Sequence, residues 1–396
     1  MKHGFYFRFY KMFKNEWFAC VLAKIAYFIY LIKFCVNKVF TKKNVVDLNA
    51  EEALIIVNKI YPKPESNPEY CNPEVNNEID LSIVIPVYNY ANILENNIKS
   101  VLNQKTKYSY EVIFVDDGST DGTQDILKKY ENHPKVKVIF QKNGGIAAAR
   151  NTGINNASGK YLMFIDCDDT VHNDIVEVLM SKAYEDDYDM VVAGHNLSKE
   201  ANGKVYQVIP NIYPDCNLSG YKNGDEIMNL PGLPWAKVYK RSLWNNVRFL
   251  PGYWYEDTII LLLIFTQCKN YSYIPKAVYD YRWYENNFSH TQGGKVTPKV
   301  IDRYWMLLDI LEKYKDLNVK DEKVIYTLIL RHLSQYFYRD IKRCPEAEEA
   351  LFILAAQLYK EWKPDYKVKL PFMLRQVEKA FEKKDINLWR LASVYN

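Results

Sequence analysis

Apolar strand-like runs alternate with helix-period segments through the middle of the chain. The runs occupy 81–87, 111–115, 136–140 and 161–165. Between them, apolar residues recur every three or four positions, as expected for helices with one buried face. Strands that alternate with helices in this way form a mostly parallel sheet with helices on both faces. The pattern therefore predicts an α/β fold of Rossmann-like, nucleotide-binding architecture.

Helical regions are predicted on both sides of this core. Residues 61–80 hold four Pro together with Asn, Ser and Glu, which is typical of a linker. Beyond the sheet, helical periodicity predicts helices over 301–314, 324–341, 347–362 and 371–381. The predicted organisation is an N-terminal helical segment, a linker, an α/β domain and a C-terminal helical region, bounded at 1–60, 61–80, 81–296 and 297–396.

The distribution of charge sets the N-terminus apart. The whole chain carries a net charge of +4. Residues 1–43 contain eight Lys and one Arg against the single acid Glu16, so this segment carries +8 and the rest of the chain carries −4. Within it lies the apolar run 17–32, which is broken only by Lys24. A basic, aromatic-rich helix of this kind is attracted to anionic lipid.

The apolar run leaves two interpretations open. Its 16 residues fall short of the roughly 20 that a spanning helix needs. At about 100° per residue, Lys24 and Lys33 fall on opposite faces, which argues against a simple one-sided amphipathic helix. We expect a peripheral or singly anchored association with the cytoplasmic face of the cell membrane. The alternative is a helix packed on the chain's own body or on a partner subunit.

Polar residues follow each predicted strand where it ends. They are Tyr88-Asn89, the turn 116–123, Asn143-Gly144-Gly145 and the acidic run 166–169. In an open parallel sheet, ligands bind outside the carboxyl ends of the strands, so these segments are predicted to face one crevice. No GxGxxG motif is present, which argues against a dinucleotide site. Taken singly, 116–123 is also an ordinary capping turn and 143–145 an ordinary glycine loop.

Three carboxylates stand within four residues at Asp166, Asp168 and Asp169. Such groups repel one another unless a cation neutralises them, the alternative being a cap for the segment that follows. Carboxylate oxygens are hard ligands that favour Mg²⁺ or Mn²⁺. Cys167 has no second thiol nearby, so neither zinc nor redox chemistry is indicated.

Four motifs occur in this region in order and at suitable spacing: SIVIPVYN, VDDGSTDGT, NGGIAAARNTG and GKYLMFIDCDD. Together they resemble the catalytic core of glycosyltransferase family 2, whose members are inverting enzymes of the GT-A fold. The resemblance covers 81–291. It implies a GT-A domain that binds a nucleotide diphosphate sugar, with UDP as the expected nucleotide.

The resemblance also implies roles for individual residues. Asp117 matches the carboxylate that hydrogen-bonds the uracil ring. Asp166 and Asp168 match a D-x-D pair, in which Asp168 ligates the metal and Asp166 contacts hydroxyl groups of the ribose or the sugar. The residues expected at the nucleotide sugar are Pro86, Tyr88, Asn89, Asp117, Gly145, Arg150, Asp166 and Asp168.

The other half of the reaction requires a general base that activates the acceptor hydroxyl. Glu256 and Asp257 precede the very apolar segment 258–265, where an acidic pair is also favoured by the helix dipole. In similar enzymes the second acid of such a pair is the base, which makes Asp257 the candidate catalytic base, with Glu256 in support. Direct displacement would then invert the anomeric centre.

Four more residues are candidates on weaker signals. Trp235 and Lys237 lie in a segment that resembles the family's acceptor-side loop, where Trp235 either stacks on a sugar or packs beside its neighbouring prolines. His290 is a candidate third metal ligand, the alternative being a surface histidine. Arg282 is a candidate to hold the diphosphate.

The expected function is the metal-dependent transfer of a sugar from a UDP-sugar to a glycan or lipid-linked acceptor in cell-surface polysaccharide biosynthesis. No nucleic-acid partner is expected. The alternative is a nucleotide-sugar-binding or scaffold component of the same assembly that has lost turnover. The retained carboxylates favour the enzyme.

Overall fold

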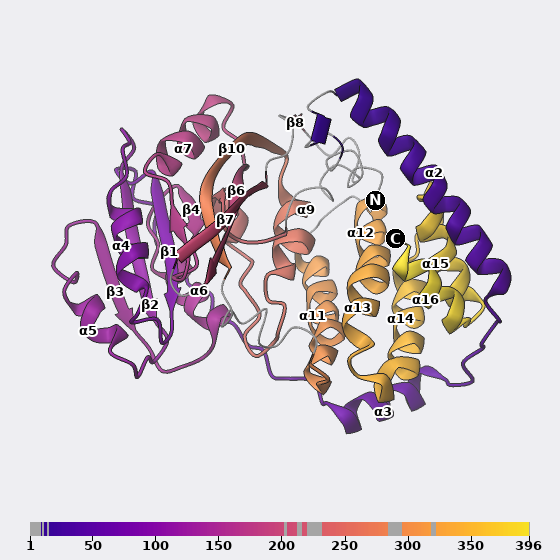
Figure 1. The fold of residues 1–396 in the computed structure, drawn as a ribbon. Coiled ribbons are helices and arrows are strands. Elements are labelled where there is room, and N and C mark those ends of the chain that lie inside the picture. The colour runs from indigo at the N-terminus through magenta and orange to yellow at the C-terminus, as the bar shows by residue number, and fades with distance from the viewer. Residues whose placement is uncertain are drawn as a thin grey trace. The chain divides into compact units, whose positions relative to one another are not determined.

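The computed structural model describes residues 9, 12–13, 16–201, 204–211, 216–219, 232–283, 295–317 and 322–395. The described residues fall into two compact units (Figure 1). Those from Glu65 to Trp283 form a unit of strands and helices, the α/β unit. Those up to Pro64 and from Lys295 onward form a unit of helices, the helical unit.

A single sheet runs through the α/β unit. Its strand order is β3-β2-β1-β4-β9-β6-β10-β5, with β7 added beside β6 and β8 beside β10. The strands are β1 (Leu81–Val87), β2 (Tyr110–Asp116), β3 (Val136–Phe140), β4 (Tyr161–Phe164), β5 (Thr170–Val171), β6 (Met190–Ala201), β7 (Lys204–Asn211), β8 (Cys216–Ser219), β9 (Lys237–Lys240) and β10 (Asn270–Trp283).

The half of the sheet made by β3, β2, β1 and β4 is parallel throughout. The register pairs Leu81 with Tyr110 on one side and with Tyr161 on the other. The carboxyl ends of all four strands therefore lie at the same edge of the sheet. Beyond β4, the strand β9 runs antiparallel to both β4 and β6, and β10 returns parallel to β6.

Helices cover both faces of the parallel half because its strands are apolar on both sides. Ile83 and Ile85 belong to the core cluster that includes Leu94 and Ile98 of α4 (Leu94–Leu102). Val84 points the other way, since neighbouring side chains on a strand alternate between faces. It lies against α6 (Ile146–Asn155), where a Cβ on Gly153 would come within 2.2 Å of Val84 Cγ1. Only a glycine admits α6 this close to β1. The same unit also contains the helices α5 (Thr123–Lys128) and α7 (Ile175–Glu185).

The helical unit combines the two ends of the chain. It contains α2 (Glu16–Phe40), α3 (Ala50–Ile60), α11 (Asp302–Leu317), α12 (Glu322–Arg331), α13 (Phe337–Ile341), α14 (Glu348–Trp362), α15 (Phe372–Glu382) and α16 (Ile386–Val394). Between α12 and α13 the backbone widens to a π-helical turn over His332–Tyr336. Phe34 of α2 is fully buried, and its ring packs edge-on against Phe372 and Tyr395. Residues more than 300 positions apart in the sequence thus share one core.

The predicted fold class is confirmed, including the apolar N-terminal helix and the helical C-terminal region. Helix α2 is longer than the apolar run 17–32 from which it was predicted. The 24 residues Trp17–Phe40 are long and apolar enough to cross a membrane, by length and composition. Helix α16 was not anticipated, although Asp385 before it is a typical N-cap and its carboxylate accepts a hydrogen bond from Leu388 N.

Candidate active site

The ends of β1 and β2 are joined through Asn89. This residue adopts φ of 58°, a left-handed conformation that Asn tolerates better than most residues. Its backbone N–H donates to Ser119 Oγ at 2.9 Å, and its side-chain oxygen accepts from Thr120 N at 2.7 Å. Tyr88 beside it is 46% exposed, whereas Pro86 is buried within β1. The turn after β2 is therefore fixed against the end of β1, with the Tyr88 ring free for contact.

Asp117 ties the end of β2 to the loop that follows β3. Its carboxylate is buried and accepts from Gln141 Nε2 at 2.7 Å, Gly144 N at 2.9 Å and Gly145 N at 2.7 Å. Gly145 has φ of 85°, which favours glycine, and α6 begins directly after it. Asp117 thus determines the shape of the loop from which α6 starts. Its expected bond to uracil stays a prediction.

The acidic run after β4 places its carboxylates in three different environments. Asp166 is partly exposed, and its Oδ1 accepts from Arg150 Nη2 at 2.8 Å. Asp168 is also partly exposed, and its Oδ2 accepts from Tyr90 Oη at 3.4 Å. Asp169 is fully buried and accepts from Tyr279 Oη at 2.6 Å and from Arg282 N at 2.8 Å. Only the first two face outward, as the D-x-D interpretation requires.

Electrostatics separates these acids as well. Burial, and then the negative charges of Asp168 and Asp166, raise the pKa of Asp169 well above its usual value. Burial also raises the pKa of Cys167, which keeps the thiol protonated and unlike a metal ligand. Asn97 holds the backbone of the run by donating to the carbonyl oxygens of Asp166 and Asp169. The run is therefore a rigid turn that presents Asp166 and Asp168.

Arg150 brings the two halves of the expected site together. It is 2% exposed on α6, and its Nη1 donates to Glu256 Oε1 at 2.7 Å while its Nη2 bonds Asp166. Its guanidinium lies over the ring of Phe249, 5.2 Å from the centroid. Although burial opposes the charge, the carboxylates of Asp166 and Glu256 raise the pKa of Arg150 above its usual value. Periodicity gave no sign of this bridge, because its three members lie far apart in the sequence.

The acidic pair sits in a tight turn rather than in a regular first helical turn. Tyr255 has φ of 65°, and Thr258 N donates to Tyr255 O at 2.9 Å. The following helix begins as an α-turn and widens to a π-helix over Ile260–Ile264, with Ile260, Leu262 and Ile264 buried. Apolar burial of this helix fixes the turn that carries Glu256 and Asp257.

Lys237 lies beside this turn and is fully buried. Its Nζ donates to Leu233 O at 2.7 Å and to Trp235 O at 3.2 Å, which fixes the loop before β9. Burial lowers the pKa of Lys237 to about 7, and the charge of Asp257 works in the opposite direction. Lys237 therefore acts within the protein, as a clamp on the loop beside Asp257.

Of the two roles considered for Trp235, stacking on a sugar and packing within the protein, the structure shows packing. It is 4% exposed and stacks on Tyr279 and Tyr281 at ring-centroid distances of 4.7 and 5.5 Å. His195 meets it edge-on at 4.8 Å. A ring so enclosed presents no face to a sugar, and its contribution is to hold β10 and the loop before β9 together.

The remaining candidates differ in what the structure says about them. His290 lies outside the described residues. Arg282 donates through Nη1 to Asp168 O at 3.3 Å, so it supports the acidic turn. Tyr90 and Tyr279 also build the site and were not expected there, whereas Asp169 belongs to the predicted acidic run but is fully buried. Tyr90 had a signal in its position directly after Tyr88-Asn89, whereas Tyr279 is brought close only by the sheet order.

The donor groups fit a divalent cation in part. Within the described residues, no group of three or more His, Cys, Asp or Glu side chains gathers as a metal site. Asp168 offers a partly exposed carboxylate, while one oxygen of Asp166 is engaged by Arg150. Two carboxylates suit a Mg²⁺-like ion that shares its coordination with substrate phosphates and water. The protein groups thus suit a metal that is held jointly with a diphosphate.

Known sequences resemble this chain over the same region. The family model for glycosyl transferase family 2 matches residues 82–243. EpsH of Bacillus subtilis (strain 168), described as a glycosyltransferase, is 31% identical over 261 residues, which is 64% of this chain and 75% of EpsH. The poly(ribitol-phosphate) beta-N-acetylglucosaminyltransferase TarP of Staphylococcus aureus (strain N315) is 27% identical over 265 residues, or 64% of this chain and 78% of TarP.

A solved structure shares the fold. Residues 1–349 of S. aureus TarS, crystallised with UDP-GlcNAc, superpose with a TM-score of 0.56 at 20% sequence identity. The superposition covers 80% of this chain and 91% of that one. At this identity the likeness concerns the fold, which extends the agreement beyond the stretch matched by the family model.

Proposed function

Because the chain belongs to glycosyltransferase family 2, we propose that it transfers a sugar from a UDP-sugar to a hydroxyl group of a cell-surface glycan, with inversion at the anomeric carbon. The observation that carries this proposal is the bridge from Asp166 through Arg150 to Glu256. It links the turn after β4, where the donor is expected, to the turn that holds the candidate base Asp257.

The donor would bind along the carboxyl edge of the parallel strands. The exposed ring of Tyr88 and the loop shaped by Asp117 are available to the nucleotide, and Asp166 and Asp168 to the ribose and diphosphate. A divalent cation, Mn²⁺ or Mg²⁺, held by Asp168 with Asp166, would neutralise charge on the departing diphosphate. UDP-GlcNAc in the TarS crystals and the N-acetylglucosaminyl activity in TarP's name support a UDP-sugar donor.

The reaction itself is a single displacement. Asp257 accepts the proton of the acceptor hydroxyl group, and the oxygen of that hydroxyl group forms a bond to the anomeric carbon. The bond from that carbon to the diphosphate oxygen breaks, and its electron pair leaves with UDP. Glu256 does not compete for the proton, because it is held as the ion-pair partner of Arg150. Two neighbouring acids thereby take different roles.

The acceptor is proposed to be a cell-surface polysaccharide or its lipid-linked precursor at the cytoplasmic face of the membrane. The name of TarP, a transferase to poly(ribitol-phosphate), supports a polymeric cell-wall acceptor. Helix α2, with Trp17–Phe40 long and apolar enough for a membrane, supports a location at the bilayer.

The function is tested by UDP release from a panel of UDP-sugars in the presence of Mn²⁺, with and without an acceptor glycan. We expect release on the cognate donor, faster with acceptor, and suppressed by EDTA. UDP binding without release from any donor would favour the non-catalytic alternative.

The base assignment is tested by Asp257→Asn. We expect transfer to fall by about 10²–10⁴-fold, the usual contribution of a general base, with the affinity for UDP unchanged. Transfer kinetics and calorimetric titration with UDP measure the two effects. Asp125→Asn, at an exposed carboxylate on α5, is the matched control. Loss of UDP binding in the Asp257 variant would overturn the assignment.

A further inference from the structure

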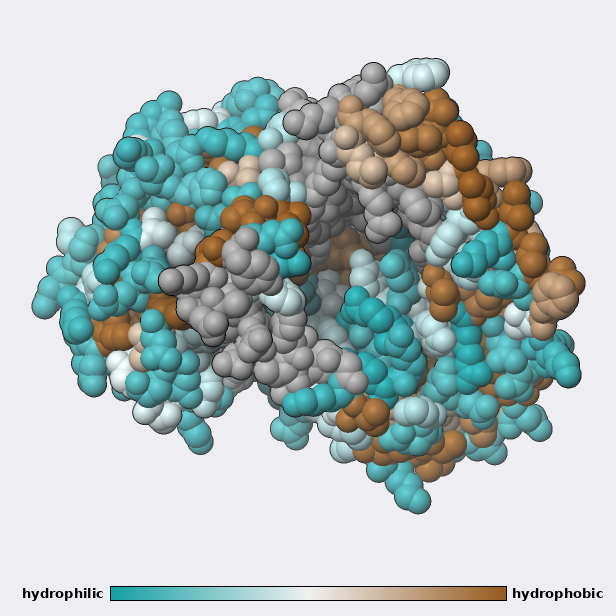
Figure 2. All heavy atoms as spheres, in the orientation of Figure 1, coloured by the Kyte–Doolittle hydropathy of each residue, from teal (hydrophilic) through white to brown (hydrophobic). Residues whose placement is uncertain are grey.

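The face of α2 that points away from the helical unit is apolar along its whole length. At about 100° per residue, its large exposed side chains fall within an arc of about 140°. Figure 2 shows them as a hydrophobic band along α2. They are Trp17, Phe18, Ile25, Phe28, Ile29, Ile32, Val36, Val39 and Phe40. Lys24 and Lys33 lie at the two borders of this arc. Lys24 and Lys33, which argued against an amphipathic helix, therefore flank the exposed face. Because the buried face is also apolar, the sequence pattern could not distinguish the two faces.

The opposite face of α2 is held by the helical unit through polar as well as apolar contacts. Tyr30 Oη donates to Val394 O at 3.1 Å, and Asn37 Nδ2 donates to Tyr395 Oη at 2.7 Å. Lys38 Nζ donates to Gln376 Oε1 at 2.6 Å. If α2 crossed a bilayer, the polar residues of α15 and α16 would enter the hydrocarbon or these bonds would break, and either is costly. These contacts therefore favour a helix that lies on the helical unit over one that crosses a bilayer.

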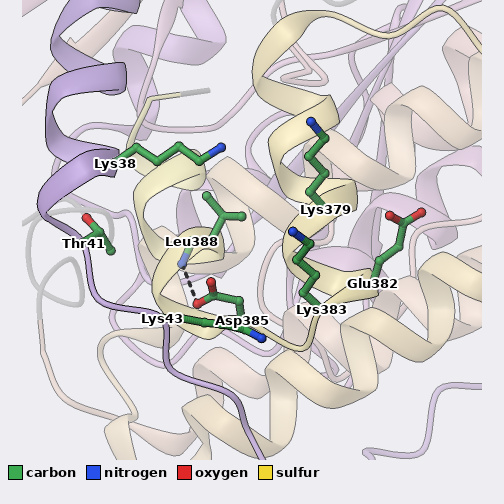
Figure 3. Close-up of a pocket in the computed structure, with 8 residues that line it drawn as sticks. All are labelled: Lys38, Thr41, Lys43, Lys379, Glu382, Lys383, Asp385 and Leu388. Carbon is green, nitrogen blue, oxygen red and sulfur yellow. Dashed lines mark hydrogen bonds between the residues drawn. The ribbon is translucent and has the colours of Figure 1, made fainter.

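A basic pocket adjoins the C-terminal end of α2. It is a hollow of about 540 Å³ between the end of α2, α15 and the start of α16. Figure 3 shows Lys38 reaching from α2 toward the α15 side of this hollow. The charged residues that line it are Lys38, Lys43, Lys379, Lys383, Glu382 and Asp385.

The acids of the pocket are already satisfied within the protein. Asp385 caps α16 and also accepts from Asn44 N at 3.2 Å. Glu382 accepts from Lys363 and Tyr359, each at 3.0 Å. The described chain supplies no carboxylate within 4.0 Å of the ammonium groups of Lys43, Lys379 or Lys383. The pocket therefore keeps an excess of positive charge.

The lysines also repel one another. Burial, and then the nearby ammonium group of Lys379, lower the pKa of Lys38; Lys383 adds to this effect, whereas Asp385 opposes it. Arg375 and Lys379 of α15 and its C-cap Lys383 are exposed and follow one another at intervals of four, so they form one basic row. Cations gathered in excess over the nearby acids are stabilised by a multiply charged anion such as a phosphate.

We propose that the outer face of α2 and the adjoining lysine pocket form one docking surface for an anionic membrane, on which α2 lies in the interfacial plane and the pocket takes the phosphate of a lipid headgroup. The apolar face would enter the bilayer to the usual depth of about 5–10 Å for such helices. The lysines that border the apolar face and line the pocket would then meet the lipid phosphates. This surface lies in the helical unit and is separate from the transferase site, so either proposal can fail without the other.

The experiment is flotation of the full chain with vesicles of phosphatidylcholine alone or with added phosphatidylglycerol. We expect binding to require the anionic lipid. Lys379→Gln/Lys383→Gln should weaken binding to anionic vesicles roughly 30-fold, as expected for two lysines at a membrane surface. Phe28→Gln/Ile32→Gln should weaken it at least as much. The matched control Lys59→Gln/Lys360→Gln, at exposed lysines outside the pocket, removes the same charge and should bind almost as the unaltered chain does.

Several results would overturn the proposal. One is unchanged vesicle binding by Lys379→Gln/Lys383→Gln, and another is an equal loss of binding in the control variant Lys59→Gln/Lys360→Gln. A third is binding of the unaltered chain to neutral vesicles as strong as its binding to anionic ones. Resistance of the bound protein to extraction by alkaline carbonate would show a spanning helix instead. A dimer in solution that Phe28→Gln/Ile32→Gln converts to a monomer would assign the apolar face to a second copy. Unchanged circular dichroism and UDP binding in the variants would show that they fold.

Discussion

The guanidinium of Arg150 is enclosed by Asp166, Glu256 and the ring of Phe249, and its planar fork gives each carboxylate its own donor nitrogen. Lysine, a point charge on a flexible stem, cannot reproduce this arrangement. Lys237 is the opposite case, because its buried amine donates to two carbonyl oxygens of its own loop. At the scale of single residues, Arg150 positions two acids and Lys237 fixes the loop beside Asp257, which is the candidate for proton transfer.

We expect Arg150→Met to lower the free energy of unfolding by about 2–3 kcal/mol, since the loss of one partner leaves two half-buried carboxylates without their counter-ion. Arg150→Met/Glu256→Gln should recover part of this loss because it removes one unpaired charge. Urea unfolding of the two variants and the unaltered chain measures both effects. A single variant as stable as the original would show that the bridge does not stabilise the fold.

The lowered pKa of Lys237 makes the free energy of unfolding depend on pH. Its pKa is lowered to about 7 by burial, whereas an unfolded lysine titrates near about 10.4. Between these values the unfolded chain binds one more proton than the folded chain, so the free energy of unfolding rises with pH, by up to about 1.4 kcal/mol per pH unit. Lys237→Met should remove this rise. Urea unfolding of both proteins between about pH 7 and about pH 10 measures it, and parallel curves would contradict the prediction.

At the scale of elements, α6 is positioned by its close approach to β1. Gly153 faces Val84 with no room for a side chain, and Arg150 lies one helical turn earlier. The acidic turn after β4 depends similarly on Asn97 of α4, which donates to two of its carbonyl oxygens. The site is thus assembled by helices that pack on the sheet, and the distance from α6 to β1 determines where Arg150 reaches.

We expect Gly153→Ala to destabilise the protein by about 1–3 kcal/mol, because the new methyl group overlaps Val84 and forces α6 away from β1. Gly153→Ala/Val84→Ala should recover much of the loss, since it vacates the space that the methyl group needs. Val84→Ala alone is the control for the cavity. Thermal unfolding measures all three, and a double variant less stable than the sum of the single effects would contradict the overlap.

At the scale of the molecule, charge and apolar surface are divided between regions. The first 43 residues carry +8 and the rest −4, and the apolar face of α2 belongs to the same N-terminal segment. The chain contributes its beginning and its end to the helical unit and its middle to the α/β unit. The proposed membrane surface and the candidate active site therefore belong to different parts of one chain.

Membrane binding should consequently depend on ionic strength. Raising the salt from about 0.1 M to about 1 M shortens the Debye length from about 10 Å to about 3 Å. We expect vesicle binding to weaken several-fold without vanishing, because insertion of the apolar face is not screened. Flotation at both salt concentrations measures this. Binding that is indifferent to salt would assign the attachment to apolar contacts alone.

The sequence determined the elements and the chemistry that each one carries. Strands such as 81–87 could be predicted because apolar side chains at consecutive positions need burial on both faces of a sheet. The carboxylates of 166–169 indicated a site because like charges so close in the chain repel one another. Only the tertiary structure decided which groups meet. Arg150 joins Asp166 to Glu256, Trp235 turns inward onto Tyr279, and α2 divides into a buried and an exposed face, although both are apolar. These outcomes depend on sheet order and helix packing, which bring together residues that local periodicity treats as independent.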